Sequence, residues 1–165
     1  EFAKFAREYG VSMRFIEFMP LDSGHEWSPD LDVPGREIFE TINAVYPLKL
    51  RNADRGTETA WKYVFDDGSP GEIGIIAPVT EMFCGACSRI RLTAERDPAN
   101  LKWDEIRTCL FSTTEHDLRG IVRSGASRNE ITQFIESVAL QKEPRHHIND
   151  ADFVQPSRTM SFIGG

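Results

Sequence analysis

Three cysteines carry the clearest chemical signal in this sequence. Cys84-Gly85-Ala86-Cys87 is followed by Cys109, a C-x2-C-x21-C arrangement. Two thiolates three positions apart can hold one metal ion or two irons of a cluster, and a returning strand can supply a third thiolate. A zinc site would need a fourth ligand, usually His, whereas a 4Fe-4S cluster on three thiolates leaves one iron open to a substrate. Three ordinary buried cysteines are the remaining alternative.

Two arginines follow the cysteine pair at strand spacing. Cys87, Arg89 and Arg91 alternate, so on a strand their side chains point to one face. Ile90 and Leu92 then occupy the other face and can pack inward. Arginine binds phosphate and carboxylate through a planar fork of donors and stays charged. The spacing indicates a wall for an anionic ligand; the alternative is that both arginines pair with carboxylates on a solvated strand.

Composition excludes several classes of protein. With 165 residues, 40% of them hydrophobic, the chain can bury a sizeable core in one or two units. The net charge of −7 argues against a general nucleic-acid binder, which needs a basic face. The sequence shows neither a long apolar run nor a basic-then-apolar leader, so we expect no membrane span and no secretion. Three cysteines suit a cluster site in a reducing cytosol, and we expect a cytoplasmic protein.

The first twenty residues read as one helix and one strand. Apolar residues recur at helical spacing before Gly10, which can close the helix, and residues 11–19 are rich in strand formers up to Pro20. A strand standing alone offers unpaired backbone edges. The pattern also opens within a helix at Glu1, so we interpret the chain as a piece of a longer polypeptide.

Helix and strand patterns alternate through the middle of the chain. Residues 38–45 carry an apolar helical stripe, residues 51–58 are polar and expected to be exposed, and residues 61–65 alternate as a half-buried strand does. Residues 72–77 return as a second strand, in which Gly74 indicates a bulge.

The last third of the sequence is expected to be largely helical. Residues 106–111 read as the strand that carries Cys109, and two helices follow. The first is stopped by Gly125, and the second begins with a capping box formed by Ser127 and Glu130.

Four segments, taken in order along nearly the whole chain, resemble one known family. They are Arg14-Phe15-Ile16-Glu17-Phe18-Met19; Phe83-Cys84-Gly85-Ala86-Cys87-Ser88-Arg89-Ile90-Arg91-Leu92-Thr93-Ala94 with Arg107-Thr108-Cys109-Leu110-Phe111-Ser112; residues 118–125; and Met160-Ser161-Phe162-Ile163-Gly164-Gly165. They resemble the last barrel strand, the second-cluster motif, the helix after the third cysteine and the Gly-Gly tail of the GTP 3′,8-cyclases. These are radical-SAM lyases of molybdenum-cofactor biosynthesis.

The resemblance implies an activity and a fold. The family rearranges GTP toward cyclic pyranopterin, using one 4Fe-4S cluster with S-adenosylmethionine near the N-terminus and a second cluster that binds GTP. The implied fold combines α/β with α+β structure. Residues 1–20 would be the last helix and strand of an incomplete, TIM-like α/β barrel. Residues 21–165 would form a C-terminal iron–sulfur and GTP-binding domain, with antiparallel strands and covering helices.

The resemblance also implies roles for particular residues. The second 4Fe-4S cluster would be held by Cys84, Cys87 and Cys109. GTP or its phosphates would be contacted by Arg14, Arg89 and Arg91. Gly164 and Gly165 would reach into the active site, where the missing Cβ lets the backbone approach a ligand. Glu17 lies three positions from Arg14, so strand alternation puts the two on opposite faces, and we expect Arg14 in the site.

Two features depart from the family pattern. The segment between the second and third cysteines is longer than usual, and the extra length falls in residues 95–105. A longer loop is tolerated because closure costs grow slowly with length. No C-x3-C-x2-C motif occurs, so the chain alone should not turn over GTP without the missing N-terminal barrel. The oligomeric state stays open, a homodimer included.

Two other interpretations compete with the cyclase family. A zinc-stabilised structural or binding module would recruit a histidine, but His116, His146 and His147 lack ligand spacing and are expected at the surface. The Gly164-Gly165 end also occurs in ubiquitin-like sulfur carriers. The helical pattern of residues 118–141 argues against that small β-grasp fold.

Overall fold

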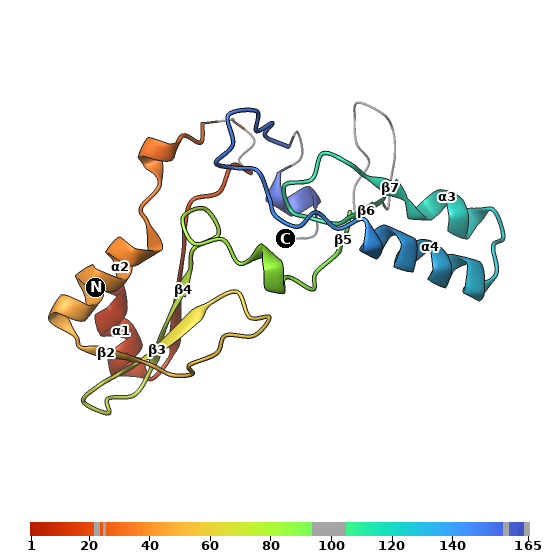
Figure 1. Cartoon of the computed structure of the whole chain (residues 1–165). Coiled ribbons are helices and arrows are strands. Elements are labelled where there is room, and N and C mark those ends of the chain that lie inside the picture. The colour runs from red at the N-terminus through yellow and green to blue at the C-terminus, as the bar shows by residue number, and fades with distance from the viewer. Residues whose placement is uncertain (22–23, 25, 94–104, 157–158, 164–165) are drawn as a thin grey trace. The chain divides into compact units, whose positions relative to one another are not determined.

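The computed structural model describes residues 1–21, 24, 26–93, 105–156 and 159–163 (Figure 1). The chain divides into two compact units. Unit 1 comprises Glu1–Met19 and Ser28–Cys87, and unit 2 comprises Pro20–Trp27 and Ser88–Gly165. The result is a mixed α/β structure in which neither sheet closes into a barrel within the described residues. None of the helices in those residues combines the length and apolar character that a membrane crossing requires.

Unit 1 is a four-stranded mixed sheet with helices on one face. Its elements are α1 (Phe2–Tyr9), β1 (Ser12–Ile16), the 3-10 turn η1 (Pro29–Leu31), α2 (Gly35–Val45), β2 (Leu48–Leu50), β3 (Trp61–Phe65), β4 (Glu72–Ile76) and the 3-10 turn η2 (Cys84–Ala86). The strand order is β1-β4-β3-β2, with β1 parallel to β4 and the other pairs antiparallel. A parallel pair needs a long crossover, and the segment containing α2 lies within it.

The predicted helix and strand at the start of the chain are confirmed. α1 ends where Gly10 adopts a left-handed conformation, with φ of 65°, which glycine tolerates without a Cβ penalty. β1 is shorter than residues 11–19, because its pairing with β4 ends at Ile16. The strands predicted near residues 61–65 and 72–77 are present as β3 and β4.

The core of unit 1 lies between the sheet and the two helices. Ala3 and Ala6 of α1 pack with Phe65, Ile73 and Ile75 of the sheet. The α2 stripe contributes the partly buried residues Ile38, Phe39 and Ile42. The predicted helical stripe is present, and Val45, its last residue, is exposed at the end of α2.

Gly74 does not mark a bulge, and that prediction is wrong. It keeps regular register in the sheet, opposite Arg14 on β1 and Lys62 on β3. A Cβ on Gly74 would lie 3.2 Å from Arg14 Cγ, so the glycine makes room for the arginine stem. Its conformational freedom is not required there.

Unit 2 combines a small antiparallel sheet with two helices. Its elements are β5 (Arg91–Leu92), β6 (Glu105–Arg107), β7 (His116–Asp117), α3 (Leu118–Arg123), α4 (Arg128–Leu140) and the 3-10 turn η3 (Met160–Phe162). The strand order is β5-β6-β7, and α3 packs against α4 (Figure 1). The capping box is confirmed, since Ser127 and Glu130 exchange side-chain and backbone hydrogen bonds at the start of α4.

The strands around the cysteine motif are shorter than predicted. β6 ends at Arg107, so Cys109 lies in the turn after the strand and not within it. On the other side, only Arg91 and Leu92 pair as a strand, so sheet alternation does not extend back to Cys87 and Arg89. Ile90 is 40% exposed and Leu92 52% exposed, so their predicted inward packing is wrong.

Candidate functional site

Arg14 projects from the face of the sheet opposite the helices. Its neighbours on β1, Met13 and Phe15, pack against the core cluster beneath α1 and α2. Successive strand residues point to opposite faces, so Arg14 lies on the open face, where it is exposed. This is the face on which a ligand can meet its guanidinium.

Glu17 lies on the other side and is a buried structural carboxylate. It is 2% exposed and accepts hydrogen bonds from the backbone N–H groups of Gly35 at 2.7 Å, Val79 at 2.8 Å and Thr80 at 3.0 Å. The Thr80 hydroxyl donates to it as well. Arg14 and Glu17 therefore lie on opposite faces of the sheet, as strand alternation predicts. Sequence reasoning missed the anchoring role of Glu17, because its partners are remote in the chain.

The first two cysteines lie at a tight turn. Cys84 begins η2, and the backbone N–H of Cys87 donates to the Cys84 carbonyl at 3.0 Å. Cys84 is the first residue of this turn and Cys87 the residue that follows it, so one tight turn separates the two thiols. Both are partly buried, and neither forms a disulfide. The C-x2-C spacing therefore gives a local geometry suited to two thiolates on one metal or cluster.

Arg55 anchors the residue that precedes this turn. Its guanidinium carbon lies 4.8 Å from the Phe83 ring centroid and 4.9 Å from that of Trp61. Such cation–π contacts are stabilising, and more so when desolvated. The expectation that residues 51–58 are uniformly exposed is wrong at Arg55, which is partly buried. A lone Arg in a polar segment gave no signal of this role.

In unit 2, Arg91 on β5 lies directly opposite Arg107 on the neighbouring strand β6. The two residues are register partners in the β5–β6 pair. Arg107 is buried, and its Nε donates to Glu115 Oε1 at 2.6 Å, which offsets its charge. Arg91 is partly buried, and Arg89, before β5, is exposed.

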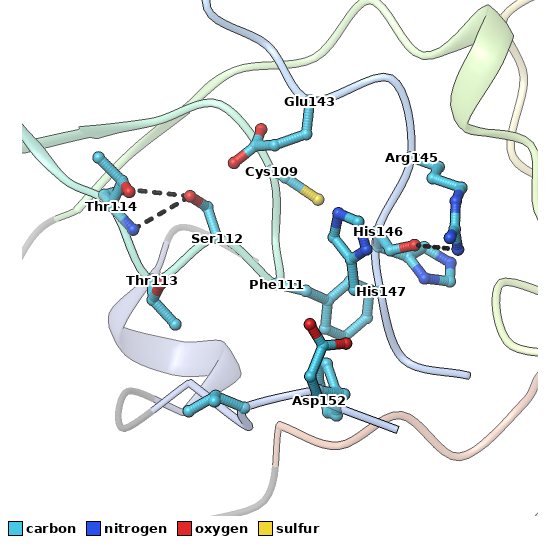
Figure 2. A pocket seen from close by; sticks show the side chains of 12 residues that line it. Cys109, Phe111, Ser112, Thr113, Thr114, Glu143, Arg145, His146, His147 and Asp152 are labelled. Carbon is cyan, nitrogen blue, oxygen red and sulfur yellow. Dashed lines mark hydrogen bonds between the residues drawn. The ribbon is translucent and has the colours of Figure 1, made fainter. Parts of the chain in front are cut away.

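Cys109 lines a pocket of about 270 Å³ in unit 2 (Figure 2). Figure 2 shows its sulfur directed into the space between Glu143 and His146. The other lining residues come from the turn after β6 and from the chain after α4: Phe111, Ser112, Thr113, Thr114, Arg145, His147, Asp152, Phe153 and Val154. Cys109 is predicted from the sequence, but the lining residues that come from the chain after α4 are not.

The histidines behave differently from one another. His146 is 5% exposed and packs edge-on against Phe111, with ring centroids 5.2 Å apart, so its predicted surface position is wrong. His147 is exposed, as predicted, and its Nδ1 lies 2.6 Å from Asp150 Oδ2. Arg145 also binds Asp150, and these contacts with Arg145 and His147 lower the pKa of that carboxyl.

The predicted cluster ligands are divided between the two units. Cys84 and Cys87 belong to unit 1, whereas Cys109 belongs to unit 2. Within the described residues, no group of three His, Cys, Asp or Glu side chains gathers around one point. The donor set nevertheless fits an iron–sulfur site chemically, because none of the three cysteines forms a disulfide and all are partly buried. Gly164 and Gly165 lie outside the described residues, and Ile163 before them is buried.

Comparison with known proteins assigns the family. Residues 11–148 match the family model described as Molybdenum Cofactor Synthesis C. The chain is 39% identical over 168 residues to a GTP 3′,8-cyclase of Mycobacterium marinum, covering 100% of this chain and 44% of the relative. It is 38% identical over 165 residues to a protein named GTP 3′,8-cyclase 2 of Mycobacterium tuberculosis, covering 98% of this chain and 44% of the relative.

The chain therefore spans less than half the length of these relatives. The resemblance to the C-terminal portion of the GTP 3′,8-cyclases is confirmed by the family match and by these identities. The chain belongs to the Molybdenum Cofactor Synthesis C family.

Proposed function

We propose that this chain is the part of a GTP 3′,8-cyclase that holds a 4Fe-4S cluster and presents GTP to it. Cys84, Cys87 and Cys109 would hold the cluster. The observation that carries the proposal is the similarity to GTP 3′,8-cyclases along the chain, together with three partly buried cysteines that form no disulfide. When bound, a cluster on three thiolates offers one iron without a protein ligand, at which a substrate can coordinate.

The chain's own residues would bind and orient the nucleotide. Arg14 offers its guanidinium from the open face of the unit 1 sheet, Arg89 lies just before β5, and Arg91 is the first residue of β5. Their planar donor forks match phosphate oxygens. Gly164 and Gly165 would complete the site from the C-terminal tail. We assign GTP as the substrate, and no nucleic acid or membrane as a partner.

The rest of the enzyme would come from the preceding part of the polypeptide. Residues 1–20 would be the last helix and strand of its incomplete α/β barrel, and residues 21–165 the C-terminal cluster-binding domain. The parallel pairing of β1 with β4 and the helix-covered face of the sheet are features of α/β architecture. The S-adenosylmethionine cluster would lie in that preceding part, so residues 1–165 alone are expected to be inactive.

Metal and sulfide analysis of the intact protein tests this proposal. After anaerobic reconstitution, replacing Cys84, Cys87 and Cys109 together by Ser should remove about four irons and four sulfides per chain. A zinc-stabilised module is the second candidate, because two cysteines share one tight turn. Loss of one zinc and no sulfide in the triple variant would favour that module and overturn the cluster assignment.

A further inference from the structure

The side chain of Lys142 bridges the two segments that lead to the candidate site in unit 2. Its ammonium Nζ donates to the carbonyl oxygen of Arg89 at 2.9 Å and also to that of Thr108. Lys142 follows α4, whereas Arg89 precedes β5 and Thr108 follows β6. An ammonium has three donors, so one lysine can satisfy both carbonyls.

This bridge lies where the sheet ladder stops. Arg91 pairs with Arg107, and two steps further along the same antiparallel register Arg89 would face Cys109. The described β5 and β6 end before that point, at Arg91 and Arg107. Beyond the ends of these strands, the lysine bridge links the carbonyl of Arg89 to that of Thr108, the residue before Cys109.

The next residue holds Thr108 a second time. Glu143 Oε2 accepts a hydrogen bond from Thr108 Oγ1 at 2.5 Å. Thr108 is buried, and both its carbonyl and its hydroxyl are thus tied to the chain after α4. Glu143 also lines the pocket into which the neighbouring Cys109 points (Figure 2). The backbone on the N-terminal side of Cys109 is therefore held at two points.

We infer that Lys142 and Glu143 are positioning residues for Cys109 and Arg89. This inference rests on the proposed function, because it concerns the thiolate that would hold the cluster and the arginine that would bind GTP. Ligands of a metal centre are oriented by the groups that hydrogen-bond around them, and losing such a partner commonly costs about 10- to 100-fold in metal affinity or activity. Neither residue needs to touch the cluster or GTP.

The test compares Lys142→Met with two controls in the intact, anaerobically reconstituted protein. Gln141→Met changes the neighbouring side chain, whose amide donates to Ser137 on the same helix. Ser127→Ala removes the cap at the far end of α4 and so lowers stability without touching the bridge. The rate of iron transfer to a chelator is measured, and the iron that the Cys84/Cys87/Cys109→Ser variant releases is subtracted.

The inference predicts that Lys142→Met releases this iron at least about tenfold faster than wild type, while both controls release it at the wild-type rate. Lys142→Arg should restore most of the retention, because guanidinium can also donate to two carbonyls. Thr108→Val, which removes only the hydroxyl bond to Glu143, should give an intermediate rate. GTP affinity should fall in Lys142→Met as well.

Three outcomes would decide against the inference. Equal release rates in wild type and Lys142→Met would overturn it, as would equally fast release in a Ser127→Ala protein of matched melting temperature. If Lys142→Met does not fold, wild-type iron retention in Thr108→Val would overturn the positioning role of Glu143. Absence of cysteine-dependent iron from the wild-type protein would instead contradict the proposed function itself.

Discussion

The carboxylate of Glu17 and the backbone N–H of Gly35 form a buried hydrogen bond of 2.7 Å. Gly35 is the first residue of α2, and a Cβ there would lie 2.8 Å from the Cβ of Ala77. The helix therefore starts against the end of β4 only because this residue is glycine. Val79 and Thr80 donate to the same carboxylate. One side chain thus joins β1, α2 and the segment that leads to the cysteine turn.

Glu17→Gln tests this junction. The amide keeps the size of the side chain but replaces one acceptor by a donor that faces backbone N–H groups. Unsatisfied buried groups commonly cost about 1–3 kcal/mol, and we expect a loss of that order in the free energy of unfolding. Denaturant unfolding of the intact protein measures it. Glu37→Gln, at an exposed position on α2, is the control and should change stability by less than about 0.5 kcal/mol. Equal effects would contradict the account.

The stability of unit 1 should depend on pH through Glu72. Burial raises the pKa of this carboxyl, but hydrogen bonds from Arg51 and Ser12 outweigh burial and hold the pKa below its ordinary value of 4.5. A depressed carboxyl pKa contributes stability that is fully present above 4.5 and lost as the pH falls through the folded-state pKa. Glu72→Gln should therefore lower stability at neutral pH and flatten its decline below 4.5.

The measurement is the free energy of unfolding from neutral pH downward. Arg51 is largely exposed, so raised salt should screen part of its interaction with Glu72 and reduce the effect. Glu40→Gln, which breaks the exposed Arg36–Glu40 pair, is the control. It should leave the decline of the unfolding free energy at acid pH unchanged. If stability declined identically at acid pH in Glu72→Gln and wild type, the role of Glu72 in the pH dependence would be refuted.

Local patterns predicted the parts of the fold that short-range chemistry determines. The end of α1 at Gly10 and the capping box of Ser127 and Glu130 each depend on a few adjacent residues. The strand β3 follows from period-two alternation over five residues, and β4 is the strand that returns after the turn. The C-x2-C spacing coincides with a short turn, η2, which begins at Cys84 and ends just before Cys87.

Long-range contacts account for what the sequence did not show. Glu17 is bonded to residues 18 to 63 positions away, and Lys142 to carbonyls 34 and 53 positions away. No periodicity encodes such partners. The predicted strand through Cys109 failed for a related reason, because pairing partners, and not residue propensity, decided where β6 ends.

Gly74 should influence GTP binding through Arg14. A methyl group at position 74 would lie 3.2 Å from Arg14 Cγ and displace the side chain on the open face of the sheet. In the intact protein we expect Gly74→Ala to weaken GTP binding by up to about tenfold. The reference is a double-mutant cycle with Arg14→Ala, in which Gly74→Ala should add no further loss. Additive losses would show that the glycine acts elsewhere.

The two arginines near β5 should each contribute to GTP affinity. Arg89→Ala or Arg91→Ala should weaken GTP binding by about 1.5–3 kcal/mol, the cost of one charge-assisted hydrogen bond. Titration of the intact protein with GTP measures this loss. Arg128→Ala, at the exposed first residue of α4, is the matched control and should have wild-type affinity. Unchanged affinity in both site variants would contradict the role of this pair in anion binding.

The most direct test of the central claim is an EPR titration of the reconstituted, intact protein with GTP. The account predicts a reduced-cluster signal that depends on Cys84, Cys87 and Cys109 and changes when GTP binds, because one iron is open to the nucleotide. A cysteine-dependent signal that GTP leaves unchanged would contradict the proposed presentation of GTP to the cluster. Zinc without sulfide at these cysteines would contradict the cluster itself.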